Sequence, residues 1–360
     1  MTALVRGVRT PGTATEVPPA LRIRVADHVL APVTVVLALV AVVCAAVTAA
    51  GGSVPVPVQL VPFAVSVLVF GLPHGALDHL VPARLRPGTS TLRSVTVVVV
   101  LYLVVGSATA LLWVVDPVVG FAAFIAVTWF HWGQGDVFVD RLLDDGASGR
   151  VGSAVTLVTR GALPMLVPFA AHPAAATAVV SSTASVVRPG AATAGPEGVP
   201  VPVRVVIGLV VLGLVVLHLV AVRRSGAPVW RQAAEDAVLL VFFAVVPPVL
   251  AVGLYFTLWH SVRHILRLEL TDPTAAAHLH HGRLRAPFGR FVRQAWPITA
   301  IAVAMLVVLA VVLRRADLGT YLVLIATLTT PHAVVVTWMD HVQHTWRRRA
   351  PGAVLQETGS

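Results

Sequence analysis

Residues 29–50 read VLAPVTVVLALVAVVCAAVTAA, a run without a charged side chain. As an α-helix rising about 1.5 Å per residue, this run is about 33 Å long, which matches the roughly 30 Å hydrocarbon core of a bilayer. The whole chain has the same character, because 57% of its 360 residues are hydrophobic, only 12% are charged and the mean hydropathy is +0.87. The sequence therefore predicts an all-α, polytopic integral membrane helical bundle.

Further apolar runs of this kind, bounded by charged or Pro/Gly-rich breaks, predict about ten transmembrane helices in total. The expected spans are 29–50, 57–80, 92–115, 118–140, 151–171, 201–222, 234–247, 249–268, 294–313 and 318–341. Only Pro247-Pro248 separates the seventh span from the eighth, so they are either two helices or one kinked helix. The segment 172–200 is the one long connection, and no firm structure is assigned to it.

The expected organisation is an N-terminal tail at 1–28, a membrane-embedded domain at 29–344 and an Arg-rich tail at 345–360. Residues 1–28 lack the compact apolar core and cleavage site of a signal peptide, so the first helix is expected to direct insertion. Cys44 is the only cysteine, which excludes an internal disulfide.

The net charge is +10, and all 26 basic residues are arginine. Without lysine the chain cannot form the Schiff base of an opsin-type pigment. Nucleic-acid binding is not expected, because the arginines lie in short loops, where they contact lipid headgroups. With ten helices and both termini cytoplasmic, twenty arginines lie inside and four outside. This distribution predicts a multi-pass protein of the plasma membrane with cytoplasmic N- and C-termini.

Four histidines of the expected spans lie in three short motifs. The motifs are Gly71-Leu72-Pro73-His74-Gly75, Phe130-His131-Trp132-Gly133 and His260-Ser261-Val262-Arg263-His264. An imidazole in hydrocarbon is costly unless it is paired or binds a metal, so each of these histidines is a candidate for a functional site.

The expected topology places these histidines at one depth. Helices two, four, eight and ten all run from outside to inside, and they carry the histidines about 16 to 25 Å along their length. The residues concerned are His74, His131, His260, His264 and His332. Independent helices have no reason to place histidines at matching depth, so we predict a common site in the inner half of the membrane.

The chemistry of this set favours a transition metal. His260 and His264 are spaced i, i+4, which lets both rings bind one ion from the same helix face. Four neutral imidazoles suit Fe, Zn, Cu or Ni and disfavour Mg or Ca. A structural zinc site is usually rich in thiolates, which this chain does not supply, so an iron with open positions is the better hypothesis.

Three polar residues near the motifs have open roles. Asp78 and Asp136 either orient imidazole N–H groups or mark the cytoplasmic interface. His332 follows Pro331, and it is a fifth ligand, a hydrogen-bond donor or an ordinary core residue. Arg263 is expected to point away from the two histidines that flank it, while Arg160 lies in mid-span and needs a partner that the sequence does not identify.

At these motifs the chain resembles the Brp/Blh family of bacterial and archaeal β-carotene 15,15′-dioxygenases. The resemblance rests on 71–78 (GLPHGALD), 131–136 (HWGQGD), Pro247-Pro248, Tyr255-Phe256, 260–264 (HSVRH) and Thr330-Pro331-His332. Their order and spacing hold from about residue 60 to residue 340. Trp132 stands where phenylalanine is more usual in the family, which is expected to change the shape of the cavity.

The resemblance implies an O₂-dependent enzyme that uses Fe(2+) to split the central double bond of β-carotene into two all-trans retinals. It makes 29–344 the catalytic domain, with metal ligands at His74, His131, His260 and His264 and no catalytic residue beyond the metal centre. Tyr255 and Trp132 are expected to line a substrate tunnel. A carotenoid about 30 Å long dissolves only in the bilayer, so an enzyme within the membrane can take it up laterally.

Two other classes of protein remain as alternatives. The pairs His74/His79 and His341/His344 allow a membrane di-iron enzyme of the desaturase or hydroxylase kind. A non-enzymatic bis-histidine haem protein, or a partner of retinal-binding proteins, is a weaker alternative. No oligomeric state is predicted.

Overall fold

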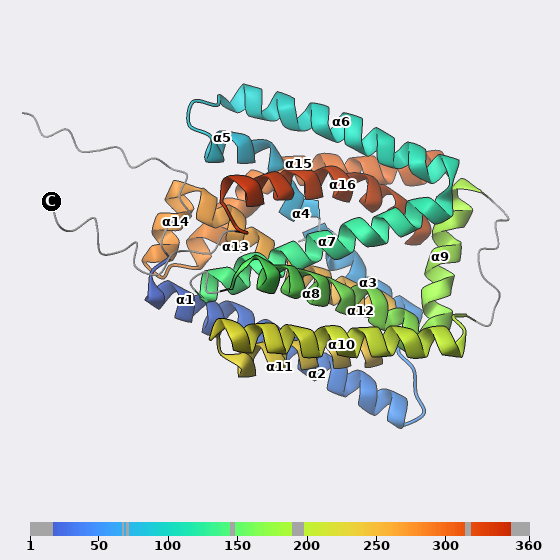
Figure 1. The fold of residues 1–360 in the computed structure, drawn as a ribbon. Coiled ribbons are helices and arrows are strands. Elements are labelled where there is room, and N and C mark those ends of the chain that lie inside the picture. Colours follow the sequence, from blue (N-terminus) through green and yellow to red (C-terminus); the bar gives the residue numbers. More distant parts are fainter. Residues whose placement is uncertain are drawn as a thin grey trace, which may run out of the picture.

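The computed structural model describes residues 17–66, 68–69, 72–144, 148–188, 198–313 and 318–346. Within these ranges the chain forms helices and no strands, which confirms the prediction of an all-α fold. The long helices lie roughly side by side across Figure 1, and α9 runs across their ends. The expected tails fall largely on 1–16 and 347–360, outside the described residues.

Seven helical segments of the described chain are long and apolar enough to cross a membrane. They are Pro19–Ala49, Thr91–Val115, Arg150–Ala171, Val201–Ser225, Pro248–Thr271, Arg285–Val308 and Gly319–Val342. They confirm a polytopic membrane protein. The other three expected spans, 57–80, 118–140 and 234–247, are not among these segments, so ten crossings stay a prediction.

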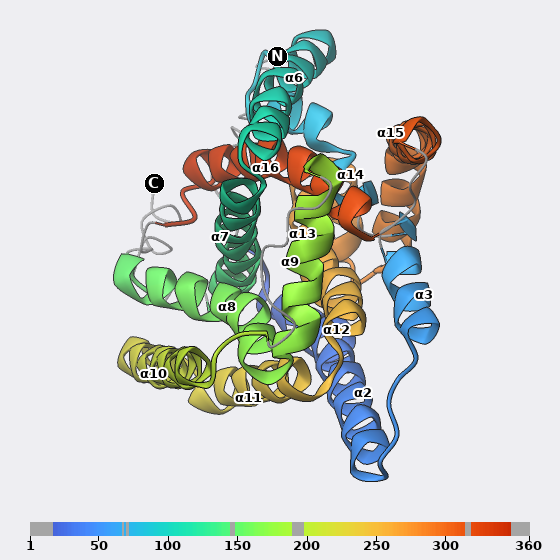
Figure 2. The same ribbon diagram turned by 90° about the vertical axis from the view of Figure 1, so that its right-hand side faces the viewer.

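The burial of these segments separates central helices from lipid-facing ones. α6 (Thr91–Val115) and α10 (Val201–Ser225) bury 6% and 17% of their apolar windows, whereas α8 (Arg150–Ala171) buries 61%. The segment Pro248–Thr271 buries 67%. Figure 2 accordingly shows α6 and α10 at the periphery and α7, α12 and α13 in the middle.

α7 (Pro117–Leu143) is a central helix with a buried polar side. His131, Gln134 and Asp136 all lie on it and are buried, which explains why α7 is less apolar than the lipid-facing helices. It packs backbone to backbone against α8, because a Cβ atom at Gly133 would overlap the carbonyl of Leu157. Small residues of this kind let membrane helices approach closely.

The expected helix at 57–80 is broken in the structure. α3 (Val56–Ser66) is followed by α4 (Leu72–Gly75), a 3₁₀ turn at Asp78–Leu80 and α5 (Val81–Leu85). Prolines at 73 and 82 cannot donate to a continuous helix, and Gly71 of the motif lies outside the described residues. His74 therefore sits at a helix break, not inside a long helix.

The segment 172–200, to which the sequence analysis assigned no structure, contains α9 (Pro173–Val187). Pro173 occupies the first helical position, which suits its fixed φ, and the helix packs against α16, α7 and α8. Alanine, serine and threonine dominate it, so its sequence carries little apolar periodicity. For that reason the sequence alone predicts no structure for this stretch.

α11 (Val229–Val245) and α12 (Pro248–Leu254) are separate helices, because Val246 and Pro247 are extended. After α12 the chain forms a π-helical segment, η4 (Tyr255–Ser261), and continues into α13 (Val262–Thr271). π-Helical segments are rare and concentrate at functional sites. α14 (Pro273–His280), α15 (Arg285–Leu313) and α16 (Leu318–Val342) complete the described fold.

Candidate metal centre

Five buried histidines from five segments meet in the middle of the bundle. α4 contributes His74, α7 His131, η4 His260, α13 His264 and α16 His332. Their side chains are between 1% and 6% exposed, and the measured ring-centroid separations run from 4.7 to 6.5 Å. The structure thus brings together all the histidines that the sequence places at one depth; we call them the histidine cluster.

The closest contact in the histidine cluster joins two imidazole nitrogens. Nε2 of His131 lies 3.0 Å from Nε2 of His260. Neighbouring nitrogen ligands that are each about 2.1 Å from a metal also lie about 3 Å apart. The separation therefore fits two ligands of one ion.

Other ring nitrogens in the histidine cluster are equally close. Donor atoms of His74, His131 and His332 lie within 4.8 Å of one another, as do those of Asp78, His264 and His332. Nε2 of His264 and Nε2 of His332 are both buried without a partner. Unpartnered buried nitrogens are costly in a protein interior, and a metal would satisfy them. The donor set fits a nitrogen-ligated transition metal.

Asp78 lies inside the protein and not at an interface. It is 2% exposed, and its Oδ2 atom accepts hydrogen bonds from the Tyr102 hydroxyl and from Nδ1 of His332, both at 2.7 Å. The sequence analysis did not identify Tyr102 as part of the site. Its only sequence signal is its hydroxyl group, and α6 carries several other hydroxyl groups on serine and threonine, so Tyr102 does not stand out.

Asp136 contacts other partners than the histidines. Its Oδ1 atom accepts from the indole N–H of Trp259 at 2.9 Å and pairs with Nε of Arg263 at 3.1 Å. The guanidinium of Arg263 also stacks on Trp259, 3.6 Å from the ring centroid. Arg263 thus points toward a carboxylate, as expected. Asp136 supports the segment that carries His260.

A second set of buried charges lies beside this segment. Arg160 pairs with Glu235 at 2.9 Å and with Asp236 at 3.1 Å, which supplies the partners that the sequence did not reveal. Asp236 also contacts Nδ1 of His218 at 2.7 Å. His218 is therefore a hydrogen-bonded structural histidine.

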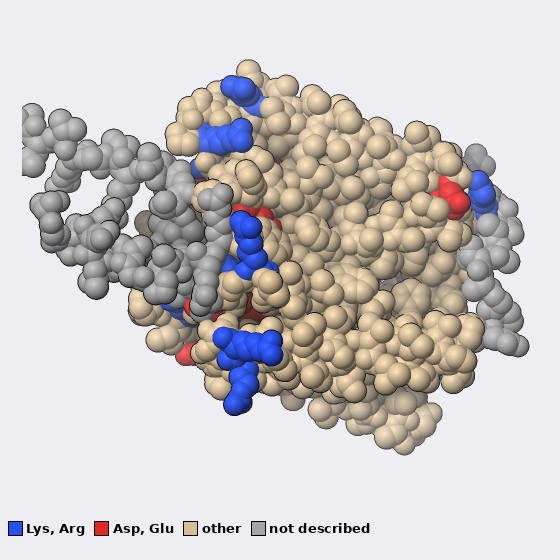
Figure 3. All heavy atoms as spheres, in the orientation of Figure 1, with Lys and Arg blue, Asp and Glu red and all other residues tan. Residues whose placement is uncertain are grey.

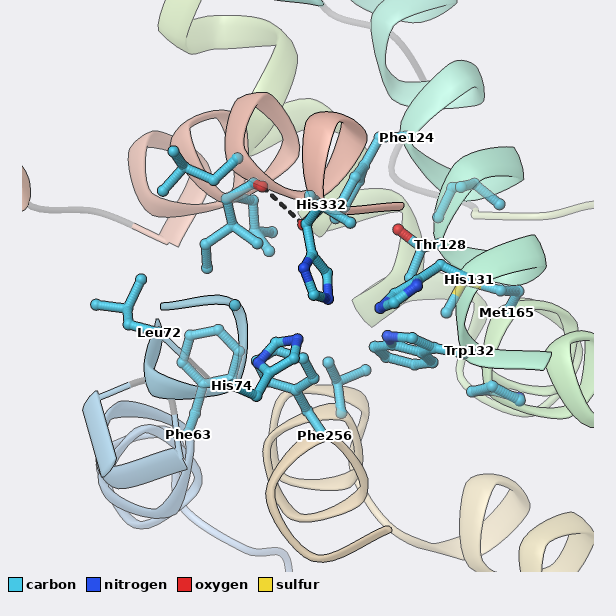
Figure 4. A pocket seen from close by; sticks show the side chains of 18 of the residues that line it. Phe63, Leu72, His74, Phe124, Thr128, His131, Trp132, Met165, Phe256 and His332 are labelled. Carbon is cyan, nitrogen blue, oxygen red and sulfur yellow. Dashed lines mark hydrogen bonds between the residues drawn. The ribbon is translucent and has the colours of Figure 1, made fainter. Parts of the chain in front are cut away.

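A cavity of about 260 Å³ adjoins the histidine cluster. Figure 4 shows His74, His131 and His332 on its wall, with Trp132, Phe256, Phe124 and Phe63 around the same space. Most of the other lining side chains are aliphatic and come from α4, α7, α8, α9, α12, α15 and α16, while α6 contributes Tyr102. The cavity can therefore hold an apolar molecule against the imidazoles.

The two expected tunnel residues occupy different positions. Trp132 lines the cavity. Tyr255 does not line it: this residue is fully buried behind Trp132, and the centroids of the two rings are 4.8 Å apart. Tyr255 instead packs in the core between Trp132 and Phe243. Phe63, Phe124 and Met165 line the cavity without having been predicted, because apolar side chains in a membrane helix carry no signal of what they face.

The fold and the site define a class: a polytopic membrane protein with a histidine-rich candidate metal centre on the wall of an apolar cavity. Residues 65–340 match the β-carotene 15,15′-dioxygenase family, and the chain belongs to this family of enzymes. The membership confirms the resemblance seen in the motifs.

Curated relatives cover most of the chain. A protein of Halobacterium salinarum named probable β-carotene 15,15′-dioxygenase Blh is 43% identical over 305 residues, which is 81% of this chain and 88% of the relative. The probable β-carotene 15,15′-dioxygenase Brp of the same species is 29% identical over 319 residues, 82% and 88% of the two chains. No solved structure matches the chain.

Proposed function

We propose that this protein cleaves the central double bond of β-carotene with O₂ and releases two molecules of all-trans retinal. The observation that carries the proposal is the position of the histidine cluster on the wall of an apolar cavity inside a membrane domain. Family membership and the names of the two relatives support the same reaction. The reaction balances, because one oxygen atom of O₂ ends in each aldehyde.

The metal of the proposal is Fe(2+), held by His74, His131, His260 and His264. Bound iron would supply the activation of O₂, for which an all-imidazole set that leaves positions open is suited. The 3.0 Å contact between Nε2 of His131 and Nε2 of His260 and the unpartnered Nε2 atom of His264 support this assignment.

The protein itself binds and orients the hydrocarbon. Phe256 and Trp132 lie against the histidine cluster, since the Phe256 ring is 5.1 Å from His74 and the Trp132 ring is 5.8 Å from His260. Flat aromatic walls can hold a conjugated chain beside the imidazoles. The apolar lining excludes water from the reacting bond.

The arrangement of arginines supports a proposed orientation. Most basic side chains in Figure 3 lie at one end of the molecule, which also carries α1 (Pro19–Val25) and α14. By the positive-inside rule this end faces the cytoplasm, with both termini there, in the plasma membrane.

The proposal is tested by expression in a bacterial host that accumulates β-carotene. We expect the wild-type protein to bleach the cells and produce retinal, with both aldehyde oxygens labelled under ¹⁸O₂. His260→Ala should abolish retinal formation. His341→Ala is the matched control, because His341 is an exposed histidine of α16, and it should leave retinal formation unchanged. Folded, iron-containing protein that forms no retinal would contradict the proposal.

An iron count separates this proposal from the di-iron alternative. His79 bonds the carbonyl of Ala76 at 2.8 Å, and His341 and His344 are exposed, so none of these three histidines joins His74 in the histidine cluster to build a second iron site. One iron per purified chain is expected. A count of two would favour the di-iron enzyme, and a Soret band would favour the haem protein.

A further inference from the structure

His332 occupies a more central place in the histidine cluster than its isolated position in the sequence indicates. Its ring centroid lies 4.7 Å from His131, 4.8 Å from His74 and 4.9 Å from His264. The other measured separations within the cluster, apart from the 4.7 Å contact of His131 with His260, are 5.4 Å or longer. His332 therefore lies between rings that are otherwise far apart, such as His131 and His264 at 6.2 Å.

The hydrogen bonds of His332 determine which nitrogen faces the cluster. Nδ1 lies 2.7 Å from the Asp78 carboxylate, so this nitrogen carries the proton and donates it. Nε2 then holds a lone pair, and it is buried without a partner. A carboxylate that fixes the tautomer of an imidazole in this way is the usual arrangement behind a metal-bound histidine.

Asp78 is in turn fixed by Tyr102. The hydroxyl of Tyr102 donates to the same Oδ2 atom at 2.7 Å, so this oxygen receives two hydrogen bonds from two helices. These two bonds hold the Asp78 carboxylate in the position from which it orients His332. The side chains of Tyr102, Asp78 and His332 form one continuous chain of hydrogen bonds, which ends at the unpartnered Nε2 atom of His332.

We infer that Nε2 of His332 is a fifth nitrogen ligand of the metal, and that Asp78, held by Tyr102, is its positioning residue. The inference rests on the metal site of the proposed function. A purely structural His332 would leave a buried nitrogen without a partner, which destabilises a protein interior. Ligation removes this loss.

The experiment measures Co²⁺ binding to the purified, detergent-solubilised protein, because the visible spectrum of Co²⁺ reports the number and kind of its ligands. The variants are His332→Gln, Asp78→Asn and Tyr102→Phe. His341→Gln is the matched control, the same substitution in the same helix at an exposed site. Thermal unfolding of the metal-free proteins shows that each variant is folded.

We expect His332→Gln to weaken Co²⁺ binding at least tenfold and to change the visible spectrum. Asp78→Asn should weaken binding about 10- to 100-fold, as loss of an orienting carboxylate does elsewhere, and Tyr102→Phe should weaken it less. His332→Ala should regain the wild-type spectrum on addition of imidazole. If His332 had only a structural role, His332→Gln would lower thermal stability but leave the Co²⁺ affinity and the visible spectrum unchanged.

A folded His332→Gln protein with wild-type Co²⁺ affinity and spectrum would overturn the inference. If His332→Gln does not fold, Asp78→Asn carries the test, and an unchanged affinity and spectrum there would overturn it equally. Retinal formation by the wild type is scored separately. Retinal with an unaltered His332→Gln spectrum removes only this inference, whereas an altered spectrum without retinal removes only the proposed reaction.

Discussion

Arg263 lies two residues after Ser261 and directly before His264, yet its side chain faces away from the histidine cluster. It stacks on Trp259 and pairs with Asp136 at 3.1 Å, while Glu235 lies 3.8 Å away. All of these groups are buried within a membrane domain. A charge in such surroundings is retained only with its counter-charge, so each member of the pair depends on the other.

This dependence predicts a coupled response to mutation. Asp136→Asn keeps an acceptor for Trp259 but leaves Arg263 without its nearest counter-charge, so it should lower the free energy of unfolding by about 3 kcal/mol. The melting temperature in detergent should fall by several degrees. The double variant Asp136→Asn/Arg263→Gln should be less destabilised than the sum of the two single variants. Additive losses would show that the two side chains are energetically independent.

Contacts between helices depend on glycine where two backbones touch. A Cβ atom at Gly253 of α12 would lie 2.7 Å from Cα of Phe63 in α3, and Phe63 lines the cavity. A Cβ atom at Gly208 of α10 would have no heavy atom within 4 Å, because this glycine faces open space. The two glycines therefore have opposite tolerance for a side chain, although both lie in apolar helices.

Gly253→Ala should force α3 away from α12 and destabilise the protein by about 1–3 kcal/mol, as overpacking does in other cores. Gly208→Ala is the control, and it should leave the melting temperature unchanged or raise it slightly, because alanine favours helix. Thermal unfolding of both variants checks the difference. Equal melting temperatures would contradict the close α3–α12 contact.

Asp272 joins three elements at the arginine-rich end of the bundle. Its Oδ1 atom caps α14 through the backbone N–H groups of Thr274 and Ala275, and its Oδ2 atom pairs with Arg84 at 3.2 Å and Arg290 at 3.1 Å. Burial raises the pKa of this carboxyl, but the Ala275 N–H and the two guanidinium groups together hold its pKa below the usual value.

A carboxyl with a lowered folded-state pKa stabilises the fold above its unfolded-state pKa of about 4, and this stabilisation is lost as the pH falls through the folded value. Asp272→Asn should therefore cost about 1–2 kcal/mol at pH 7. The difference from wild type should shrink as the pH drops below about 4. Asp116→Asn, at the half-buried cap of α7, is the control and should have little effect, because asparagine caps as well as aspartate. A pH-independent loss would contradict this account.

Apolar runs predicted the long helices well, because hydrocarbon length alone sets their extent. The interruption after α4, at 76–80, was not predicted: Pro73 and Gly75 are visible in the sequence, but an apolar composition continues through them. α9 was missed for the opposite reason, since its small and hydroxylated residues become helical by packing on α16 and α7. Composition indicates where a chain can cross a membrane and not how it bends within it.

At the scale of the whole molecule, the matching depth of the histidines was the informative signal. It grouped five histidines from distant segments, and the structure places all five together. Their role as ligands stays a prediction. Tyr102 and the lining of the cavity could not be predicted, because which face of an apolar helix meets a neighbour depends on packing that no local pattern encodes.

The orientation of the molecule can be measured with single cysteines. On a Cys44→Ala background, Ser53→Cys lies after α2 (Ala31–Ala49), and Thr274→Cys lies in α14 at the opposite, arginine-rich end (Figure 1). Both positions are exposed. A membrane-impermeant maleimide should label Ser53→Cys in spheroplasts and Thr274→Cys only after lysis. The reverse pattern would invert the proposed orientation.

The histidine cluster is drawn from segments that leave the ribosome at very different times. His74 lies in α4, near the start of the membrane domain, whereas His332 lies in α16, the last helix of the described chain. Until α16 has entered the bilayer, the cavity lacks one wall and the cluster lacks a member. The full set of five histidines and the closed cavity therefore exist only once the last described helix has joined the bundle, although the four proposed ligands are present earlier.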